Sequence, residues 1–504
     1  MSLISIQNLT FSYDGNDQTI FDHVSFQFDT HWKLGFIGRN GRGKTTFLRL
    51  LQKEFSYTGT ISCAVPLYYF PMRIPDQDEM VVDLLSIFNP NCDLWMFQRE
   101  FSLLKLDESV LYRPYSTLSN GEQTKIQLAS LFLQENSFLL IDEPTNHLDW
   151  HGRQTVARYL NQKKQGFLLV SHDRTFLDQC VDHILSINRN NIEVQQGNCS
   201  SCLENKQRQD QFEQAENEKL QKEISRLQKS AQQTANWSDK LEKTKIGTRV
   251  SGLKPDRGYI GHKSAKMMQR SKSIQQRRQK AVEQKSSLLK NIETTATLKL
   301  SPLTWHTNTV ASCSNLSITY DDISVCQDVA FTIQRGDRIA LCGKNGCGKS
   351  SILKLFQGYS IPYQGEISIH PNLQISYLPQ DCSQLNGDLK EFIQQHNLEE
   401  SLFKAILRKL DFSRSLFDLP MEGYSNGQKK KIYLAASLCK PAHLYLWDEP
   451  LNYIDLYSRI QIEELLLQYQ PTLLFVEHDQ SFLEHVATKQ VVLSSSCPIH
   501  KNIV

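Results

Sequence analysis

Apolar residues along the chain form two similar series of short runs, separated by a long polar stretch. Runs such as LGFI, FLLI and FLLV occur in the first part, and RIAL, LYLW and LLFV occur in the last part. Each run is flanked by segments with helical spacing of apolar residues. Short continuous apolar runs between helices are typical of parallel strands buried on both faces, so the pattern predicts an α/β fold in each part.

Motifs recur along the chain at a nearly constant offset. Lys44 and Lys349 are 305 residues apart, and three further pairs are each 306 apart: Ser119 and Ser425, Asp142 and Asp448, and His172 and His478. A fixed offset across a whole domain indicates two copies of one fold. The sequence therefore predicts a first domain over 1–198, a second over 303–498 and a short tail over 499–504.

The segment between the repeats, 199–302, differs from both in composition and pattern. Apolar residues fall mostly at helical spacing on either side of a Gly- and Pro-containing break over 246–263. This pattern predicts a linker folded as an antiparallel helical hairpin with its tip at the break. A helix over 203–243 would be about 60 Å long at the usual rise of 1.5 Å per residue.

Charge is concentrated in this linker. Residues 203–292 carry 21 Lys and Arg against 10 Asp and Glu, so the rest of the chain carries −9 within a net charge of +2. A charge run is often only a solvated helical face. At the tip of a hairpin on an otherwise acidic body, however, it favours contact with the phosphates of a polyanion.

The remaining composition is that of an ordinary globular protein of two or three domains. Hydrophobic residues make up 40% and charged residues 22% of 504 positions, without an apolar run of membrane-spanning length or a secretory signal. We therefore expect a cytoplasmic protein whose twelve cysteines are reduced. Cys199 and Cys202 have a spacing also found in redox and zinc sites, but without a second pair they are expected to be ordinary thiols.

Each repeat contains a glycine-rich loop between an apolar strand and a helix. The sequences are GRNGRGKT and GKNGCGKS. Glycines allow backbone N–H groups to surround phosphates, the helix N-terminus adds its positive end, the lysine contacts the terminal phosphates and the hydroxyl binds Mg²⁺. The predicted nucleotide-binding residues are Gly38, Asn40, Gly41, Gly43, Lys44, Thr45 and Thr46 in the first repeat, and Gly343, Asn345, Gly346, Gly348, Lys349, Ser350 and Ser351 in the second.

An Asp-Glu pair follows a later apolar strand in each repeat, in FLLIDEP and LYLWDEP. An isolated pair would ordinarily be a turn. These pairs, however, follow the Ser-Asn-Gly segment by 23 residues and precede a histidine by 30 in both repeats. We expect Asp142 and Asp448 to hold Mg²⁺, and Glu143 and Glu449 to orient or deprotonate the attacking water.

His172 and His478 follow further apolar strands, and their matched positions favour contact with the terminal phosphate over a purely structural role. The Ser-Asn-Gly segments begin helices. Their simplest role is as N-caps, but Ser119 with Gly121, and Ser425 with Gly427, are also suited to bind a phosphate held by another domain.

Together these motifs resemble the ATP-binding-cassette ATPases, whose LSGGQ signature is similar to LSNGEQ and YSNGQK here. The resemblance covers both repeats and implies head-to-tail pairing within a monomer, so that each ATP lies between the phosphate loop of one repeat and the signature of the other. Tyr13 and Tyr320 correspond to the aromatic residue that stacks on adenine, and Gln380 to the loop glutamine that completes the Mg²⁺ site. Met72 replaces that glutamine in the first repeat, which implies slower hydrolysis there or use of a water instead. Leu451 and Tyr453 stand where the first repeat has Thr145 and His147.

Two cassettes joined by a long charged helical linker, without a membrane segment, resemble the ABC-F family, and the motif sequences are similar to its Lsa-type antibiotic-resistance members. This resemblance implies a ribosomal protection factor. Its ATP-bound form would enter the exit site of the 70S ribosome and reach past the peptidyl tRNA. There it would promote release of lincosamides, pleuromutilins and streptogramin A drugs, and ATP hydrolysis would release the protein. The implied tRNA and rRNA contacts are Lys245, Arg249, Lys254, Arg257, Lys263, Lys266 and Arg270.

Three other functions fit parts of this pattern. A housekeeping ABC-F translation factor would share every motif without conferring resistance. An efflux transporter ATPase would pair with a membrane subunit, but a long basic hairpin has no evident use there. DNA repair and chromosome organisation are least favoured, because such chains usually carry longer coiled coils or zinc modules.

Overall fold

A computed structural model describes residues 2–13, 19–146, 148–187, 192–243, 298–320 and 323–493, with isolated positions 269 and 276. The chain divides into two compact units. One comprises Met1–Cys202 with Thr295–Val504, and contains both repeats; the other is Leu203–Thr294. The two repeats therefore pack together as one unit, as the motif pattern predicts.

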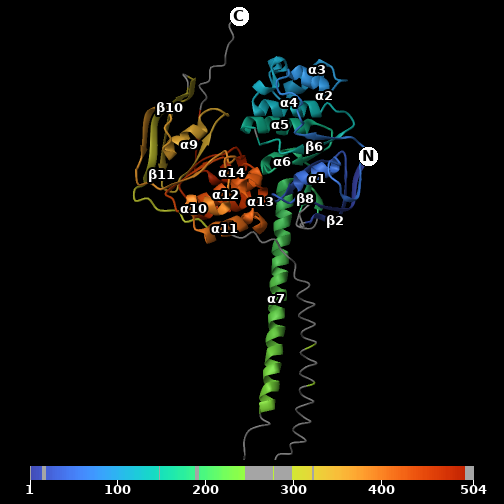
Figure 1. The fold of residues 1–504 in the computed structure, drawn as a ribbon, viewed down its shortest axis with the longest axis vertical. Coiled ribbons are helices and arrows are strands. Elements are labelled where there is room, and N and C mark those ends of the chain that lie inside the picture. Colours follow the sequence, from blue (N-terminus) through green and yellow to red (C-terminus); the bar gives the residue numbers. More distant parts are fainter. Residues whose placement is uncertain are drawn as a thin grey trace, which may run out of the picture. The chain divides into compact units, whose positions relative to one another are not determined.

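The first repeat contains two sheets together with several α-helices (Figure 1). A six-stranded sheet has the order β5-β6-β7-β3-β8-β9 and is parallel except for β9, and a three-stranded antiparallel sheet has the order β2-β1-β4. The strands are β1 (Leu3–Ser12), β2 (Thr19–Asp29), β3 (Lys33–Gly38), β4 (Thr58–Ser62), β5 (Leu67–Phe70), β6 (Phe138–Asp142), β7 (Phe167–Val170), β8 (His183–Ile187) and β9 (Ile192–Gln196). The helices are α1 (Lys44–Leu51), α2 (Val81–Phe88), α3 (Leu94–Leu103), α4 (Asn120–Leu131), α5 (Trp150–Gln162) and α6 (Arg174–Cys180).

The second repeat has the same architecture, which confirms the predicted duplication. Its parallel sheet has the order β14-β15-β16-β12-β17, and its antiparallel sheet the order β11-β10-β13. The strands are β10 (Thr309–Tyr320), β11 (Ile323–Gln334), β12 (Arg338–Cys342), β13 (Tyr363–Ile369), β14 (Ile375–Leu378), β15 (Leu444–Asp448), β16 (Leu473–Val476) and β17 (Lys489–Val492). The helices are α9 (Lys349–Gln357), α10 (Leu389–Gln395), α11 (Glu400–Lys409), α12 (Asn426–Cys439), α13 (Leu456–Tyr469) and α14 (Gln480–Val486).

Burial explains the contrast between the two kinds of sheet. Every residue of β7 and β16 is buried, because both faces of each parallel sheet are covered; Leu168 and Val170 of β7 share one core with residues of β1, β2 and α1. β1 instead alternates, with Ile4 and Ile6 buried and their neighbours more exposed, as expected for a strand with one face toward the core. The apolar runs in the sequence thus mark the central strands, at whose carboxyl ends the acidic motifs lie.

Two helices that carry the Ser-Asn-Gly motifs begin with the same cap. The Ser119 hydroxyl accepts from the Glu122 N–H, while the Glu122 carboxylate accepts from the Ser119 N–H at 2.9 Å. Ser425 and Gln428 form the equivalent capping box at the start of α12. Reciprocal caps satisfy backbone donors that a helix start otherwise leaves unpaired. The N-cap interpretation of both motifs is therefore correct, and it leaves other N–H groups of the first turn for a ligand.

The linker begins with one long helix, α7 (Cys199–Lys243), in agreement with the predicted first arm (Figure 1). Phe212, one of its apolar residues, is exposed. The predicted tip over 246–263 lies outside the described residues. So do the predicted RNA-contacting residues Lys245, Arg249, Lys254, Arg257, Lys263, Lys266 and Arg270, and the tail over 499–504.

The linker also ends close to the second repeat in sequence. Leu298 and Leu300 are buried in the core of that repeat, so its packing starts a few residues before the predicted position 303.

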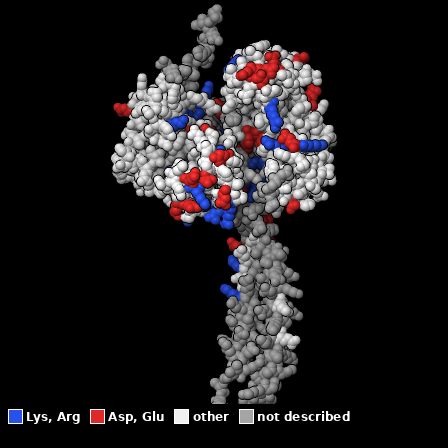
Figure 2. Space-filling view, in the orientation of Figure 1, with Lys and Arg blue, Asp and Glu red and all other residues white. Residues whose placement is uncertain are grey.

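Across the visible face of the two repeats, basic and acidic side chains are mixed (Figure 2).

Two smaller expectations concern membranes and cysteines. Within the described ranges, no helix combines the length and the apolar character needed to cross a bilayer. Cys199 and Cys202 are both free thiols and both buried at the start of α7. Burial raises the pKa of the Cys199 thiol, which keeps it protonated and unreactive at neutral pH.

Candidate functional site

The phosphate loops lie between the central strand and the first helix of each repeat, β3 to α1 and β12 to α9. Gly43 and Gly348, the N-caps of these helices, have φ of 89° and 87°, in the left-handed region. A Cβ at Gly43 would lie 2.5 Å from the Ile20 side chain, so the loop requires glycine for both conformation and space. The chain therefore turns there sharply enough to direct several backbone N–H groups into the loop.

The loop lysines occupy the centre of each turn. The Lys44 ammonium donates to the Gly38 carbonyl at 2.8 Å and to the Arg39 carbonyl at 3.2 Å, and Lys349 makes the matching bonds to Gly343 and Lys344 at 2.9 Å each. Burial lowers the pKa of Lys44, partly offset by the carboxylates of Asp455, Glu143 and Asp142. A phosphate ligand would supply the negative charge that a buried ammonium needs.

The hydroxyl and carboxylate predicted to hold Mg²⁺ are in contact in both repeats. Thr45 Oγ1 donates to Asp142 Oδ2 at 2.8 Å, and Ser350 hydrogen-bonds to Asp448. Asp448 Oδ1 is buried and, among the described residues, has no hydrogen-bond partner. Burial raises the pKa of both aspartates. A bound cation would satisfy this oxygen and stabilise the ionised form of both groups.

The two glutamates immediately after these aspartates share an unusual backbone. Glu143 and Glu449 have φ of 50° and 46°, which is costly for a residue other than glycine. Each is held there because its N–H donates to the last residue of the neighbouring strand, Val170 at 2.9 Å and Val476 at 3.0 Å. The strained turn directs the glutamate side chain away from the strand, toward the histidine that follows β7 or β16.

The histidines are buried beside these glutamates. His172 Nε2 lies 3.2 Å from Glu143 Oε1, and His478 Nε2 lies 3.8 Å from Glu449 Oε1. Burial lowers the pKa of His172 well below its ordinary value, and lowers that of His478 to about 3 with help from the positive charge of Lys349. Both imidazoles are therefore neutral at physiological pH and can donate a hydrogen bond without adding charge.

The glutamate carboxyls titrate in the opposite direction. Burial, followed by the charge of Asp142, raises the pKa of Glu143 to about 8. Burial, followed by the charge of Asp448, raises the pKa of Glu449, against a lowering effect of the Gln380 hydrogen bond. A carboxyl whose pKa is raised from its ordinary value is better suited to exchange protons with a water molecule.

The loop after β14 differs from its counterpart after β5. Gln380 Nε2 donates to Glu449 Oε1 at 2.8 Å. At the corresponding place in the first repeat, the backbone N–H of Met72 donates to Gln127 Oε1 at 2.9 Å. Tyr69 instead donates its hydroxyl to Asp142 Oδ2 at 3.0 Å. The two catalytic carboxylate sets thus have different polar neighbours.

The predicted adenine-stacking tyrosines lie at the mouths of the two loops. Tyr13 hydrogen-bonds to Thr46 Oγ1 at 2.8 Å, and Tyr320 donates to Ser351 Oγ at 3.1 Å. They are 41% and 39% exposed, so each presents ring surface that a planar base can cover.

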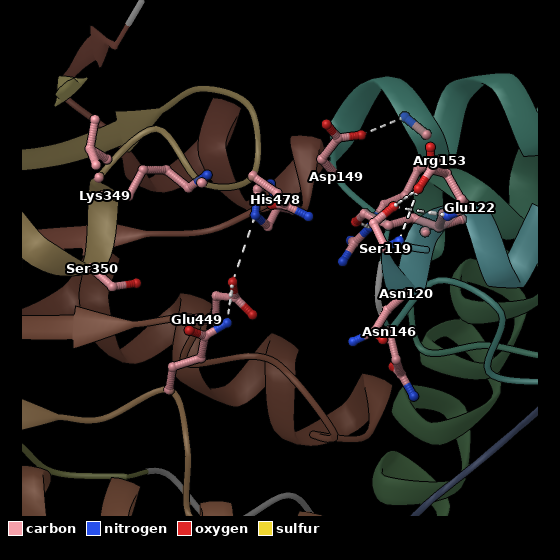
Figure 3. Close-up of a pocket in the computed structure, with 18 of the residues that line it drawn as sticks. Ser119, Asn120, Glu122, Asn146, Asp149, Arg153, Lys349, Ser350, Glu449 and His478 are labelled. Atoms are coloured by element: carbon pink, nitrogen blue, oxygen red, sulfur yellow. Dashed lines mark hydrogen bonds and ion pairs between the residues drawn. The ribbon is translucent and has the colours of Figure 1, made fainter. Parts of the chain in front are cut away.

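A cavity of about 730 Å³ joins the phosphate loop of the second repeat to the signature helix of the first (Figure 3). Lys349, Ser350, Glu449 and His478 line one side, and Ser119 lines the other (Figure 3). Other predicted residues that line it are Gly121, Tyr320, Asn345, Gly346, Gly348, Ser351 and Gln380. The volume falls within the roughly 300–1,000 Å³ typical of small-molecule sites.

The other composite site, between the first phosphate loop and the second signature, is closed by direct contacts. Asn40 Nδ2 donates to the Tyr453 carbonyl at 2.7 Å. A Cβ on Gly427 would lie 2.9 Å from the same Asn40 nitrogen. The predicted crossed pairing therefore brings the phosphate loop of one repeat next to the signature of the other, by direct contact at the first site and across a cavity at the second.

The residues present fit a nucleotide with Mg²⁺. Each loop offers a buried lysine, a threonine or serine hydroxyl and a buried aspartate, and the second site adds a signature serine across a cavity of suitable size. Sequence reasoning did not identify Asn146, Asp149 and Arg153, which also line the cavity beside the first signature helix. Asp149 could have been found, because it caps α5 immediately after the acidic motif.

The fold and these paired sites define a tandem P-loop ATPase whose nucleotide sites lie between its two halves. The sequence model of the ABC transporter family matches residues 21–146 and 326–452, which together span half of the chain. The protein belongs to the ABC transporter family, and its two cassettes are ATP-hydrolysing domains.

Relatives match over the whole chain. The ribosome protection protein VmlR of Bacillus subtilis (strain 168) is 29% identical over 98% of this chain and 87% of its own length. ABC transporter F family member 5 of Arabidopsis thaliana is 25% identical over 98% and 75%. The expected kinship with ABC-F proteins is thus confirmed.

A solved structure shows the same fold. The archaeal ribosome recycling factor aABCE1, in complex with the archaeal ribosomal stalk protein aP1, matches with a TM-score of 0.64 and 19% identity, covering 97% of this chain and 88% of that one.

Gly427 provides a test of the closed first site. A methyl group there would lie 2.6 Å from the Tyr453 carbonyl and would strain the contact with Asn40. Overpacking of this kind costs about 1–3 kcal/mol, so Gly427→Ala should slow ATP turnover about tenfold or more. Gly423→Ala is the matched control, because a Cβ there meets nothing within 4 Å. Equal turnover of the two variants in a steady-state phosphate-release assay would contradict the assigned packing.

The raised pKa of Glu143 predicts a pH-dependent stability. Between the ordinary value of 4.5 and about 8, the folded, nucleotide-free protein holds a proton that the unfolded chain releases. Its free energy of unfolding therefore falls as pH rises through this window. Glu143→Gln removes this loss, so the variant should be more stable than the unmodified protein by on the order of 2–4 kcal/mol at pH 8 and by little at pH 5.

Thermal unfolding followed by circular dichroism at each pH measures this difference. The exposed Glu135→Gln controls for loss of a surface charge. A constant difference between Glu143→Gln and the unmodified protein across the pH range would show that Glu143 ionises normally.

Proposed function

We propose that this protein is an ATP-driven ribosomal protection factor that binds the exit site of the 70S ribosome and promotes release of antibiotics acting at the peptidyl-transferase centre. The observation that carries the proposal is the likeness, over 98% of the chain, to a protein named for ribosome protection. Both cassettes retain a complete set of loop lysine, acidic pair and histidine, as a cycle of ATP binding and hydrolysis requires.

The residues of each site have distinct roles in this proposal. The loop N–H groups with Lys44 or Lys349 bind the phosphates, while Thr45 with Asp142, or Ser350 with Asp448 and Gln380, hold Mg²⁺, which neutralises developing phosphate charge. Glu143 and Glu449 would orient the attacking water or, in their ionised form, deprotonate it. The neutral imidazoles of His172 and His478 donate to the terminal phosphate, so they stabilise charge without repelling Lys44 or Lys349.

Crossed pairing couples this chemistry to movement. The signature residues Ser119 with Gly121, and Ser425 with Gly427, contact the phosphate bound by the other cassette. A nucleotide therefore stabilises the closed arrangement of the cassettes, and loss of the terminal phosphate removes a contact that spans both. Binding to the ribosome would follow closure, and departure would follow hydrolysis.

The linker would provide the contact with RNA. Its net charge of +11 over residues 203–292 suits a structured polyanion, because Lys and Arg neutralise phosphates without reading sequence. In this proposal Lys245, Arg249, Lys254, Arg257, Lys263, Lys266 and Arg270 contact peptidyl tRNA or rRNA. The tip would approach the site of lincosamides, pleuromutilins and streptogramin A drugs, as in the Lsa-type proteins that the sequence resembles.

Replacing both catalytic glutamates should trap the protein on ribosomes. Glu143→Gln with Glu449→Gln keeps the size and hydrogen bonding of each side chain but removes the base, so nucleotide should bind and turnover should fall by roughly 100-fold or more. Sedimentation of lysates through sucrose, with ATP added, measures ribosome association. The single variants provide intermediate controls. A double variant that turns over ATP normally, or that stays off ribosomes when ATP is bound, would refute the assigned roles.

Deleting residues 247–261 tests the role of the linker tip. The deletion removes the predicted tip but leaves both ATP sites, so resistance should be lost while basal ATPase activity is kept. Growth in graded lincosamide, pleuromutilin and streptogramin A concentrations measures resistance, and phosphate release measures ATPase activity. Replacement of 247–261 by a Gly-Ser segment of equal length controls for linker length. Resistance that survives both changes would refute the role of the linker tip.

A further inference from the structure

The two composite ATP sites differ in how the cassettes meet. At the first site, Arg42 Nη2 lies 3.5 Å and Arg39 Nη1 lies 3.8 Å from Asp411 Oδ2. Both arginines belong to the first phosphate loop, whereas Asp411 follows α11 in the helical part of the second cassette. The pairs lie across the interface and are mostly shielded from solvent, with exposed side-chain fractions of 24%, 10% and 25% for Arg42, Arg39 and Asp411.

Further contacts extend this attachment around the same loop. The Arg39 guanidinium lies over the Tyr457 ring, 5.7 Å from its centre, and Asn40 donates to the Tyr453 carbonyl at 2.7 Å. The Arg39 carbonyl in turn accepts a hydrogen bond from Lys44. The first phosphate loop is therefore tied to the second cassette at three residues that closely precede Lys44, the residue that would contact the phosphates.

The repeat provides the corresponding positions at the second site. Lys105 occupies the place of Asp411 in the first cassette. Both residues follow the third helix of their cassette, and their φ angles are 52° and 60°. The N–H of each donates to the carbonyl three residues earlier, that of Ser102 at 3.2 Å and that of Arg408 at 3.1 Å. The counterparts of Arg39 and Arg42 are Lys344 and Cys347. Where the first site has two arginines and an aspartate, the second has two lysines and a cysteine, so no ion pair can form between these positions.

We propose that Asp411 is a positioning residue for the first ATP site: by pairing with Arg39 and Arg42 it holds the first phosphate loop against the second cassette, so that this site closes more readily than the second. The inference deepens the proposed ATPase cycle. Because the first phosphate loop is already held against the second cassette, less conformational entropy is lost when a nucleotide binds. The affinity of the first site for nucleotide is therefore higher. The second site, with an open cavity and like charges at the equivalent positions, would require nucleotide to close.

Hydrogen–deuterium exchange of the full-length, nucleotide-free protein tests the attachment directly. Asp411→Asn removes the charge but keeps the size and tolerates the left-handed backbone. We expect faster exchange in peptides over 39–51, with peptides over 344–357 unchanged. Lys105→Asn is the matched control and should leave both peptides as they are. Unchanged exchange over 39–51 in Asp411→Asn would overturn the proposal, whether or not the protein acts on ribosomes.

Single-site kinetics test the consequence for nucleotide. In a Glu449→Gln background, turnover reports the first site, and Asp411→Asn should raise its KM for ATP by about three- to tenfold with little change in kcat, the range expected for one partly buried interfacial charge pair. In a Glu143→Gln background, which reports the second site, KM should not change. A fall in kcat with unaltered KM would indicate a general structural defect and overturn the positioning role.

Reversing the charges distinguishes an ion pair from mere packing. Asp411→Arg should raise the KM at the first site further, and combining it with Arg42→Asp should restore at least part of the affinity, because opposite charges again face each other. If the combined variant is as weak as or weaker than Asp411→Arg alone, the ion pair does not position the loop.

Discussion

The contact between the two cassettes brings the phosphate loop of one half against the signature helix or the loops of the other, and every functional element depends on this contact. The lysines, aspartates and glutamates of the two sites lie at or beside this contact. Burial then sets their chemistry: it raises the pKa of Glu143 and Glu449 and lowers that of His172 and His478. Charged groups so enclosed interact strongly with one another and with any phosphate bound among them.

Backbone strain places the catalytic groups within this interface. Glu143 and Glu449 adopt left-handed conformations because strand pairing holds their N–H groups, and the fold must supply the free energy for this. The strained turn and the buried histidine are present in both cassettes. Both sites therefore have the same arrangement of glutamate and histidine. The different neighbours of Asp142 and Glu449, Tyr69 in one case and Gln380 in the other, then provide a physical basis for unequal rates.

The duplication also shows how two copies of one fold become unequal. The backbone at Lys105 and Asp411 is similar, with φ of 52° and 60°, yet the two side chains have opposite charges, and Asp411 pairs with Arg39 and Arg42. One interface is consequently held by ion pairs and hydrogen bonds, while the other encloses a cavity of about 730 Å³. A small number of substitutions at an interface can thus make the surroundings of two sites unequal although both retain the loop lysine, the acidic pair and the histidine.

Local sequence determined the fold of each cassette, the two phosphate loops, the acidic pairs and the long first arm of the linker. These features depend on glycine geometry, apolar periodicity and helix caps, which act between residues close in the chain. The tertiary structure alone decided that a cavity lies at the second site, that Arg39 and Arg42 meet Asp411, and that the glutamates are buried enough to shift their pKa. The ion pairs join residues more than 300 positions apart in the chain. Such contacts, and the burial around them, depend on how the surfaces of the two folded cassettes pack together.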